Sequence, residues 1–181
     1  MDVAAAWSFL EQSDLVAGAE EVQAALRRVA ADIGSRLARD YPLVLAVMGG
    51  AVVFAGQLLP LLRFPLDFDY IHVSRYGSAT RGSRVDWRVT PPESVRGRAV
   101  LVVDDILDGG ETMAAIRERL LALGARAFHC AVLVEKTLQK EKPIRADFVG
   151  LRIPDRFVFG YGMDAKGYWR NLPEIRAMHG T

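Results

Sequence analysis

The residues with the clearest chemical potential lie in one short run, VLVVDDILDGGET, which spans residues 100–112. Two adjacent carboxylates, Asp104 and Asp105, follow four apolar residues of the kind that a buried parallel strand uses. A third carboxylate, Asp108, comes directly before a pair of glycines. This order predicts a strand that ends in acidic residues and is followed by a glycine loop.

The chemistry expected of this loop is recognition of a sugar phosphate. Gly109 and Gly110 let backbone N–H groups approach phosphate oxygens, and the helix that Thr112 opens adds the favourable field of its N-terminus. The paired acids can accept hydrogen bonds from the two hydroxyl groups of a ribose. A response-regulator receiver domain also has an acidic pair after a strand, but near its start, whereas Asp105 lies past the middle of this chain.

The elements that must position this loop alternate between helices and strands. Hydrophobic periodicity predicts helices over residues 19–39, 51–62 and 112–123, and strands over residues 43–48, 66–73, 85–89, 100–103, 127–134, 147–153 and 157–161. Such alternation is typical of an α/β fold with a mainly parallel sheet. In open sheets of this kind, ligands bind at the carboxyl ends of strands, where the remaining polar motifs also fall.

Length and composition fit one globular domain over residues 1–181. Hydrophobic residues make up 51% and charged residues 25%, and the net charge of +1 gives no general attraction to nucleic acid or membranes. The one cysteine, Cys130, lies in an apolar run, which predicts a buried core residue, and zinc-site spacing is absent. No signal-peptide pattern or spanning apolar segment is present. We therefore expect a cytoplasmic protein with no nucleic-acid and no membrane partner.

The run over residues 100–112 closely resembles the phosphoribosyl-pyrophosphate signature of the type I phosphoribosyltransferases. Ordered motifs over residues 15–176 make the chain similar to the hypoxanthine-guanine phosphoribosyltransferases, nearest to the proteobacterial type. The resemblance implies an α/β, type I phosphoribosyltransferase-like fold, with a mainly parallel twisted sheet flanked by helices, a small hood and a mobile loop. It also implies purine salvage, in which the 5-phosphoribosyl group passes from phosphoribosyl pyrophosphate to hypoxanthine or guanine, giving IMP or GMP and pyrophosphate.

The resemblance assigns substrate contacts to several segments. Met48 stands where the family often carries lysine or arginine, so the glycines that follow are expected to contact pyrophosphate through backbone amides. Arg75 stands at the usual serine position of the mobile loop that closes over the substrate. The substrate-binding residues that the resemblance implies are Gly49, Gly50, Tyr76, Gly109, Gly110, Glu111, Thr112, Phe157, Val158 and Arg170.

The resemblance also implies how the purine is recognised. Lys136 matches the lysine that contacts the 6-oxo group, and an ammonium group can donate to an oxo group but cannot accept from an amino group. This favours hypoxanthine or guanine over adenine. Phe157 matches the residue that stacks on the purine, and backbone groups at Val158 match those that contact its edge.

Catalytic and metal-binding roles follow from the same resemblance. Asp108 is expected to act as general base for the purine ring proton. Magnesium commonly uses one or two carboxylates together with substrate phosphates. The expected catalytic residues are Asp108, Lys136, Asp104 and Asp105, and the expected Mg²⁺ ligands are Asp164, Asp104 and Asp105.

Two positions of the signature depart from many relatives. Asp104 stands where glutamate is common and is one methylene shorter. Glu111 stands where lysine or a neutral residue is common, and a carboxylate beside a phosphate is unfavourable unless it points outward. Asp108, which the chemistry needs most, is retained.

A function other than catalysis remains an alternative. Some proteins of this fold sense nucleotides and regulate transcription, which would predict an added DNA-binding module or a basic face; the net charge of +1 argues against this class. A weakened binding module without DNA stays open, as does the preference among hypoxanthine, guanine and xanthine. The resemblance implies a homodimer or homotetramer, with the apolar residues Trp7, Phe9 and Leu10 packing on the core or on a neighbouring subunit.

Overall fold

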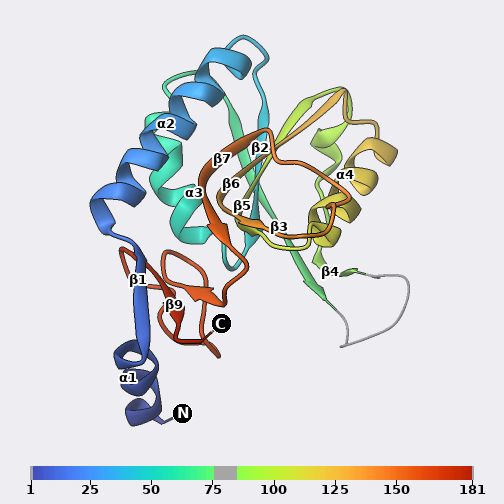
Figure 1. The fold of residues 1–181 in the computed structure, drawn as a ribbon. Coiled ribbons are helices and arrows are strands. Elements are labelled where there is room, and N and C mark those ends of the chain that lie inside the picture. Colours follow the sequence, from blue (N-terminus) through green and yellow to red (C-terminus); the bar gives the residue numbers. More distant parts are fainter. Residues whose placement is uncertain (1, 76–84, 181) are drawn as a thin grey trace.

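The computed structural model describes residues 2–75 and 85–180, which form a larger and a smaller β-sheet with helices around them (Figure 1). Helices α2 and α3 cover one face of the larger sheet and α4 covers the other. The elements are, in chain order, α1 (Val3–Glu11), β1 (Ser13–Ala17), α2 (Ala19–Leu37), β2 (Leu43–Met48), α3 (Val52–Leu58), the 3₁₀ turn Leu59–Leu61, β3 (Asp67–Arg75), β4 (Val85–Val89), the 3₁₀ turn Glu93–Val95, β5 (Ala99–Leu107), α4 (Glu111–Ala122), β6 (Ala127–Thr137), β7 (Phe148–Pro154), β8 (Val158–Phe159) and β9 (Ile175–Met178).

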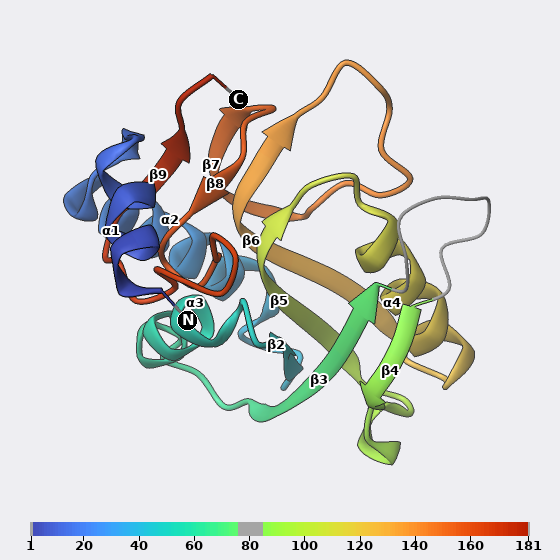
Figure 2. The same ribbon diagram turned by 90° about the horizontal axis from the view of Figure 1, so that it is seen from below.

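The larger sheet has the strand order β4-β3-β2-β5-β6-β7, in which only the pairing of β3 with the edge strand β4 is antiparallel. The chain passes from β2 to β3 on one side, and β5 later pairs with the other side of β2. Strand order therefore reverses between β2 and β5, and ligands of open α/β sheets bind outside the carboxyl ends of strands at such a point. Figure 2 looks onto this end of the sheet, with the smaller sheet and α1 to one side.

The sheet separates two apolar cores because side chains alternate along each strand. Val44 and Ala46 of β2 belong to the core beneath α2 and α3, whereas Leu43 and Leu45 belong to the core beneath α4. Amphipathic helices complete both cores; their fully buried side chains include Leu26 and Ile33 of α2 and Met113, Ile116 and Leu120 of α4. The α/β architecture with a mainly parallel sheet is confirmed.

Several predicted strands were too short, and one helix starts earlier than predicted. β5 does not end at Val103, because its pairing with β6 continues from Asp104↔Val132 to Leu107↔Glu135. Asp104 and Asp105 therefore lie inside this strand and not after it. β6 in turn continues to Thr137, so Lys136 lies within the strand, where it pairs with Ile153 of β7. The helix of the signature starts at Glu111, one residue before Thr112.

The smaller sheet was not predicted as a separate unit. The expected strand over residues 157–161 is only Val158–Phe159, and it joins an antiparallel sheet of order β1-β9-β8. β1 and β9 come from opposite ends of the chain, and together with α1 they were missed. The expected mobile loop begins at Ser74 and Arg75, which are the last two residues of β3, whereas Tyr76 and the residues that follow it to 84 lie outside the described residues. Within the described residues, each helix is too short or too polar to cross a membrane.

Candidate active site

A pocket of about 200 Å³ lies where the carboxyl ends of β5 and β6 meet the segment around β8. Its lining comes from parts of the chain that are far apart in sequence. The residues that line it are Asp105, Ile106, Asp108, Lys136, Phe157, Val158, Met163 and Asp164. The structure thus brings together most of the side chains that the sequence nominated for catalysis, purine recognition and magnesium binding.

Two residues that line the pocket, Lys136 and Asp108, form an ion pair. The Lys136 Nζ lies 3.3 Å from Asp108 Oδ1 and 3.4 Å from Asp155 Oδ1. The lysine side chain is only 12% exposed, whereas Asp108 is 42% and Asp155 is 65% exposed. Pairing of β5 with β6 ends at Leu107↔Glu135, and the next residue on each chain segment is Asp108, just after β5, and Lys136, within β6. The sheet register itself therefore brings the proposed base and the ammonium group together.

The acidic pair lies against the first glycine loop. Asp105 is 9% exposed, and its backbone N–H donates to Asp104 Oδ1 at 3.0 Å. The Asp105 carboxyl leaves no room for a side chain at Gly50. Gly162 has φ +106°, and a Cβ atom at this position would clash with the Gly50 carbonyl oxygen. These contacts require glycine at both positions and place the Gly49-Gly50 loop, entered by a cis Met48–Gly49 peptide bond, beside the acidic pair.

Burial raises the pKa of Asp105 above the ordinary aspartate range. The hydrogen bond with the Asp104 side chain and the positive charge of Arg170 act in the opposite direction and do not cancel the effect of burial. A carboxyl group that is buried beside a second one has few hydrogen bonds to water, so hydroxyl donors can bind to it favourably. Ribose hydroxyls would supply the hydrogen bonds that water cannot.

The second glycine loop leads into α4. Gly110 has φ +89° and is the N-cap residue, so the amides of the first helical turn are directed toward the loop. Thr112 is the second residue of this helix. The Glu111 carboxyl folds back against Gly109 and lies 3.7 Å from the Lys140 Nζ. It does not point away from the loop, and it therefore opposes an anion bound there.

Asp164 and Arg170 contact each other. The Arg170 guanidinium lies 2.5 Å from Asp164 Oδ1 and donates to the Gly162 carbonyl at 2.6 Å, while Asp164 Oδ2 accepts from the Gly167 amide at 2.6 Å. Across residues 2–75 and 85–180, no group of three or more His, Cys, Asp or Glu side chains is arranged to hold a metal ion. Asp105 and Asp164 do line the same pocket, which suits Mg²⁺ because it needs few protein carboxylates when substrate phosphates complete its shell.

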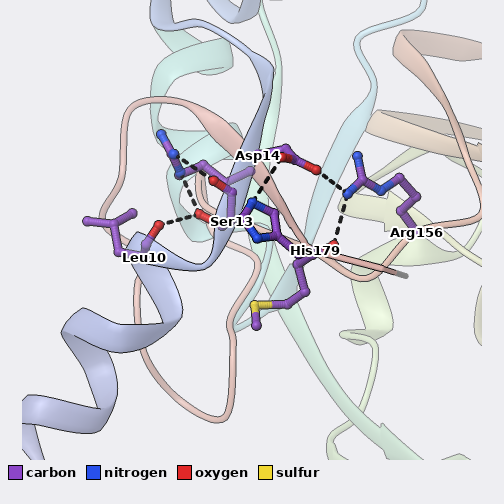
Figure 3. Close-up of polar contacts among 7 residues, drawn as sticks. Leu10, Ser13, Asp14, Arg156 and His179 are labelled. Atoms are coloured by element: carbon purple, nitrogen blue, oxygen red, sulfur yellow. Dashed lines mark hydrogen bonds and ion pairs between the residues drawn. The ribbon is translucent and has the colours of Figure 1, made fainter.

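The segment that is expected to bind the purine contacts β1 and β9, which lie near the two ends of the chain. Phe157 is 45% exposed on the pocket, and its carbonyl accepts from the Met178 amide of β9 at 3.1 Å. The Arg156 guanidinium donates to Asp14 Oδ2 at 2.6 Å and to the Met178 carbonyl at 2.9 Å. Figure 3 shows Asp14 between Arg156 and His179, whose Nε2 lies 3.0 Å from Asp14 Oδ1. Arg156 holds the pKa of Asp14 below its usual range.

Two residues with a structural part in the site were missed from the sequence. Arg156 precedes Phe157 but was treated only as part of a motif, and its partner Asp14 lies 142 residues away. Lys142 contacts two backbone carbonyls near the pocket, a kind of contact that leaves no pattern of residue types. Cys130 is buried, as expected, and burial raises the pKa of its thiol to about 12.

The strand order, with an acidic pair and two glycine loops at its switch point, defines a type I phosphoribosyltransferase fold. Residues 16–166 match the family described as phosphoribosyl transferase domain. The chain belongs to this family and, within it, to the hypoxanthine-guanine phosphoribosyltransferase group.

Named relatives support this assignment along most of the chain. The hypoxanthine-guanine phosphoribosyltransferase of Bacillus subtilis is 34% identical over 157 residues, which cover 86% of this chain and 87% of the relative. That of Aquifex aeolicus is 32% identical over 158 residues, covering 86% and 89%. A hypoxanthine phosphoribosyltransferase of Trypanosoma cruzi, solved as a ternary substrates complex, has a TM-score of 0.86 at 28% identity and covers 94% of this chain and 97% of that chain.

The raised pKa of Asp105 predicts a stability gain when its charge is removed. In the unfolded chain this carboxyl ionises near 3.8, whereas the folded protein retains the proton to higher pH. Wild-type stability therefore falls as pH rises from about 4 through the raised value. We expect Asp105→Asn to melt at a higher temperature than wild type at pH 7, with a gap that closes as pH falls toward 4.

Thermal unfolding followed by circular dichroism at several pH values would measure this gap. The matched control is Asp32→Asn, which removes an exposed carboxylate from α2 and should follow wild type at every pH. A gap for Asp105→Asn that is absent at pH 7, or that widens on acidification, would contradict the assigned cost of burying this charge.

Proposed function

We propose that the protein transfers the 5-phosphoribosyl group from phosphoribosyl pyrophosphate to hypoxanthine or guanine, giving IMP or GMP and pyrophosphate. The observation that carries this proposal is the pair formed by Asp108 and Lys136, 3.3 Å apart in a pocket that Phe157 also lines. One partner can accept the purine ring proton while the other donates to the 6-oxo group. The named relatives act as independent support.

The substrate's sugar phosphate fits the polar surfaces beside this pair. The amides of Gly109, Gly110 and the first turn of α4 would hold the 5′-phosphate, together with the Thr112 hydroxyl. Asp104 and Asp105 would accept hydrogen bonds from the two ribose hydroxyls. The substrate then lies across the carboxyl ends of β2, β5 and β6, with its anomeric carbon directed at the purine.

Pyrophosphate departure needs positive groups on the other side of the ribose. The Gly49 and Gly50 amides and the Arg170 guanidinium would contact the leaving group, whose paired oxygens suit a planar, fork-shaped donor. Arg170 is bound to Asp164 in the structure, so it would exchange this partner for pyrophosphate. Tyr76 would belong to the loop that excludes water from the reacting sugar.

The reaction exchanges one bond at the anomeric carbon for another. The bond to pyrophosphate breaks with its electron pair, the sugar gains cation-like character, and a purine nitrogen forms the new bond. Asp108 accepts the ring proton, and Lys136 stabilises the negative charge that develops on the 6-oxo group. Phe157 and the backbone at Val158 would hold the purine plane in line with the sugar.

Magnesium is the cofactor that this chemistry calls for. Asp164, with Asp104 and Asp105 on the ribose side, would hold Mg²⁺ through carboxylate oxygens, and the bound ion would neutralise charge on the pyrophosphate. We further propose a cytoplasmic homodimer or homotetramer with no nucleic-acid or membrane partner. Trp7 is consistent with packing of the N-terminus on the core or on a neighbouring subunit. The centroid of its ring lies 5.1 Å from that of Trp169, and the residue is still 54% exposed.

Pyrophosphate release by the purified protein tests this function. The assay contains magnesium and phosphoribosyl pyrophosphate, with hypoxanthine, guanine, xanthine or adenine offered separately. We expect turnover with hypoxanthine or guanine and little with adenine. Turnover with adenine alone would overturn the role of Lys136, and tight nucleotide binding without turnover would indicate a sensor instead of an enzyme.

Lys136 has two carboxylate neighbours, Asp108 and Asp155, and only Asp108 is proposed to act as a general base. Variants of the two therefore distinguish a catalytic role from simple charge pairing. Asp108→Asn is expected to lower kcat by about 10²–10⁴-fold, since the general base is lost. Asp155→Asn removes an exposed carboxylate at nearly the same distance and should stay within about threefold of wild type. Steady-state kinetics with hypoxanthine gives both values. Equal losses in the two variants would show that Asp108 only balances the charge of Lys136.

The position of Glu111 predicts a gain in substrate affinity on neutralisation. Two like charges about 4 Å apart in water repel by about 1 kcal/mol, so Glu111→Gln is expected to lower the KM for phosphoribosyl pyrophosphate about fivefold. Added salt should narrow the difference by screening. Glu118→Gln, on an exposed turn of the same helix, is the control and should leave this KM unchanged. An unchanged or higher KM in Glu111→Gln would refute the repulsion.

A further inference from the structure

Lys142 lies in the segment between β6 and β7 and extends to the edge of the candidate active site. Its Nζ donates to the Leu107 carbonyl at 2.9 Å and to the Lys136 carbonyl at 2.6 Å. Leu107 is the residue before Asp108, and Lys136 is the proposed purine-binding lysine. One ammonium group therefore contacts the backbone on both sides of the Asp108–Lys136 pair.

This contact falls where the sheet stops holding the two strands together. The pairing of β5 with β6 ends at Leu107↔Glu135, and beyond it the backbone of Lys136 pairs with β7 alone. Asp108 begins the glycine loop and has left the sheet. An ammonium group has three donors, so it can bind both carbonyls at once. It can therefore hold the two backbones at a fixed distance, as strand pairing does further back in the sheet.

Lys142 is partly buried and is held by two backbone carbonyls. Burial, the largest effect, lowers the pKa of its ammonium group below the usual lysine range, although the negative charges of Glu135, Asp108 and Asp155 act in the opposite direction. The neighbouring Pro143 and Ile144 lie 3.4 Å from the place of a Cβ atom at Gly110, so the same segment packs over the phosphate loop.

We propose that Lys142 is a positioning residue, which sets the distance between Asp108 and Lys136 and thereby the preference for a 6-oxopurine. This inference rests on the proposed function, because the preference is expressed only during phosphoribosyl transfer. The contact uses backbone carbonyls, so neither Asp108 nor Lys136 has to change its side-chain partners for Lys142 to act. Loss of the contact would loosen the pair without removing either group.

The test compares three variants of the full chain. Lys142→Met keeps the length of the side chain but cannot donate; Lys142→Arg keeps donors for two carbonyls. Arg145→Met is the matched control, because Arg145 is a cation of the same segment that is 90% exposed and pairs only loosely, at 3.9 Å, with Glu141. Circular dichroism and thermal unfolding establish which variants fold, and kinetics follow with hypoxanthine and adenine.

We expect Lys142→Met to lower kcat with hypoxanthine by about 10- to 100-fold, as small misplacements of reacting groups do. The KM for phosphoribosyl pyrophosphate should stay within about twofold, and the ratio of hypoxanthine to adenine turnover should fall, because Lys136 is less firmly placed. Lys142→Arg should recover most of the loss. Wild-type rates in Lys142→Met, or an equal loss with both bases and no recovery in Lys142→Arg, would overturn the proposal.

Lysine side-chain NMR gives a readout that does not need turnover. The Lys142 signal is identified by its loss in Lys142→Met, and the Lys136 signal should move in this variant but not in Arg145→Met. If wild type turns over no base, the proposed function fails while this comparison still decides the contact. An unmoved Lys136 signal would overturn the positioning role even in an active enzyme.

Discussion

The parallel pairing of β5 with β6 is the constraint on which the rest of the site depends. The pairs run from Ala99↔Ala127 to Leu107↔Glu135 and bury one of the most apolar stretches of the chain. Because the two strands run parallel, the residues that follow the last pair, Asp108 and Lys136, lie side by side and form an ion pair. A shift of one residue would turn each side chain to the opposite face, so apolar packing far below the pocket determines the geometry of its charges.

The strand β5 contributes to stability through its apolar residues and also carries a carboxyl group whose ionised form is disfavoured by burial. Val100 to Val103 are fully buried, and burial of each such side chain contributes about 1.5–3 kcal/mol. Asp105, two residues further on, is buried as well, and its raised pKa records the cost of an ionised carboxyl there. Gly50 and Gly162 approach this carboxyl and each other only because they lack side chains. Without substrate, the free-energy cost of burying the Asp105 carboxyl is offset by the apolar packing of β5. A substrate that hydrogen-bonds to Asp105 would reduce this cost.

Apolar periodicity and family motifs in the sequence predicted most strands and the candidate site residues. The sequence did not predict features that depend on strand pairing or on backbone contacts. The strand Leu43–Met48 was predicted with its observed bounds, because every residue is apolar and glycines follow. The predicted ends at Val103 and Val134 were wrong, since the polar residues beyond them break the hydrophobic pattern while the ladder continues. The smaller sheet was missed because β1 and β9 are short, and their pairing joins opposite ends of the chain, which no local pattern records. The roles of the motif residues stay predictions, although the structure places six of them around one pocket, namely Asp105, Asp108, Lys136, Phe157, Val158 and Asp164.

The two sheets carry different parts of the candidate site. The larger sheet carries the acidic pair, the glycine loops and Lys136, whereas Phe157 and Val158 belong to the smaller sheet, in which β8 has only two residues. So short a strand is held by its neighbours: by Met178 of β9 and, through Arg156, by Asp14 of β1. β8 is also anchored from below, because Phe159 is fully buried and Val158 belongs to the core beneath α2 and α3. The backbone at Gly162 lies so close to the Gly50 carbonyl oxygen that a Cβ atom would not fit between them, so the segment after β8 packs directly against the Gly49-Gly50 loop.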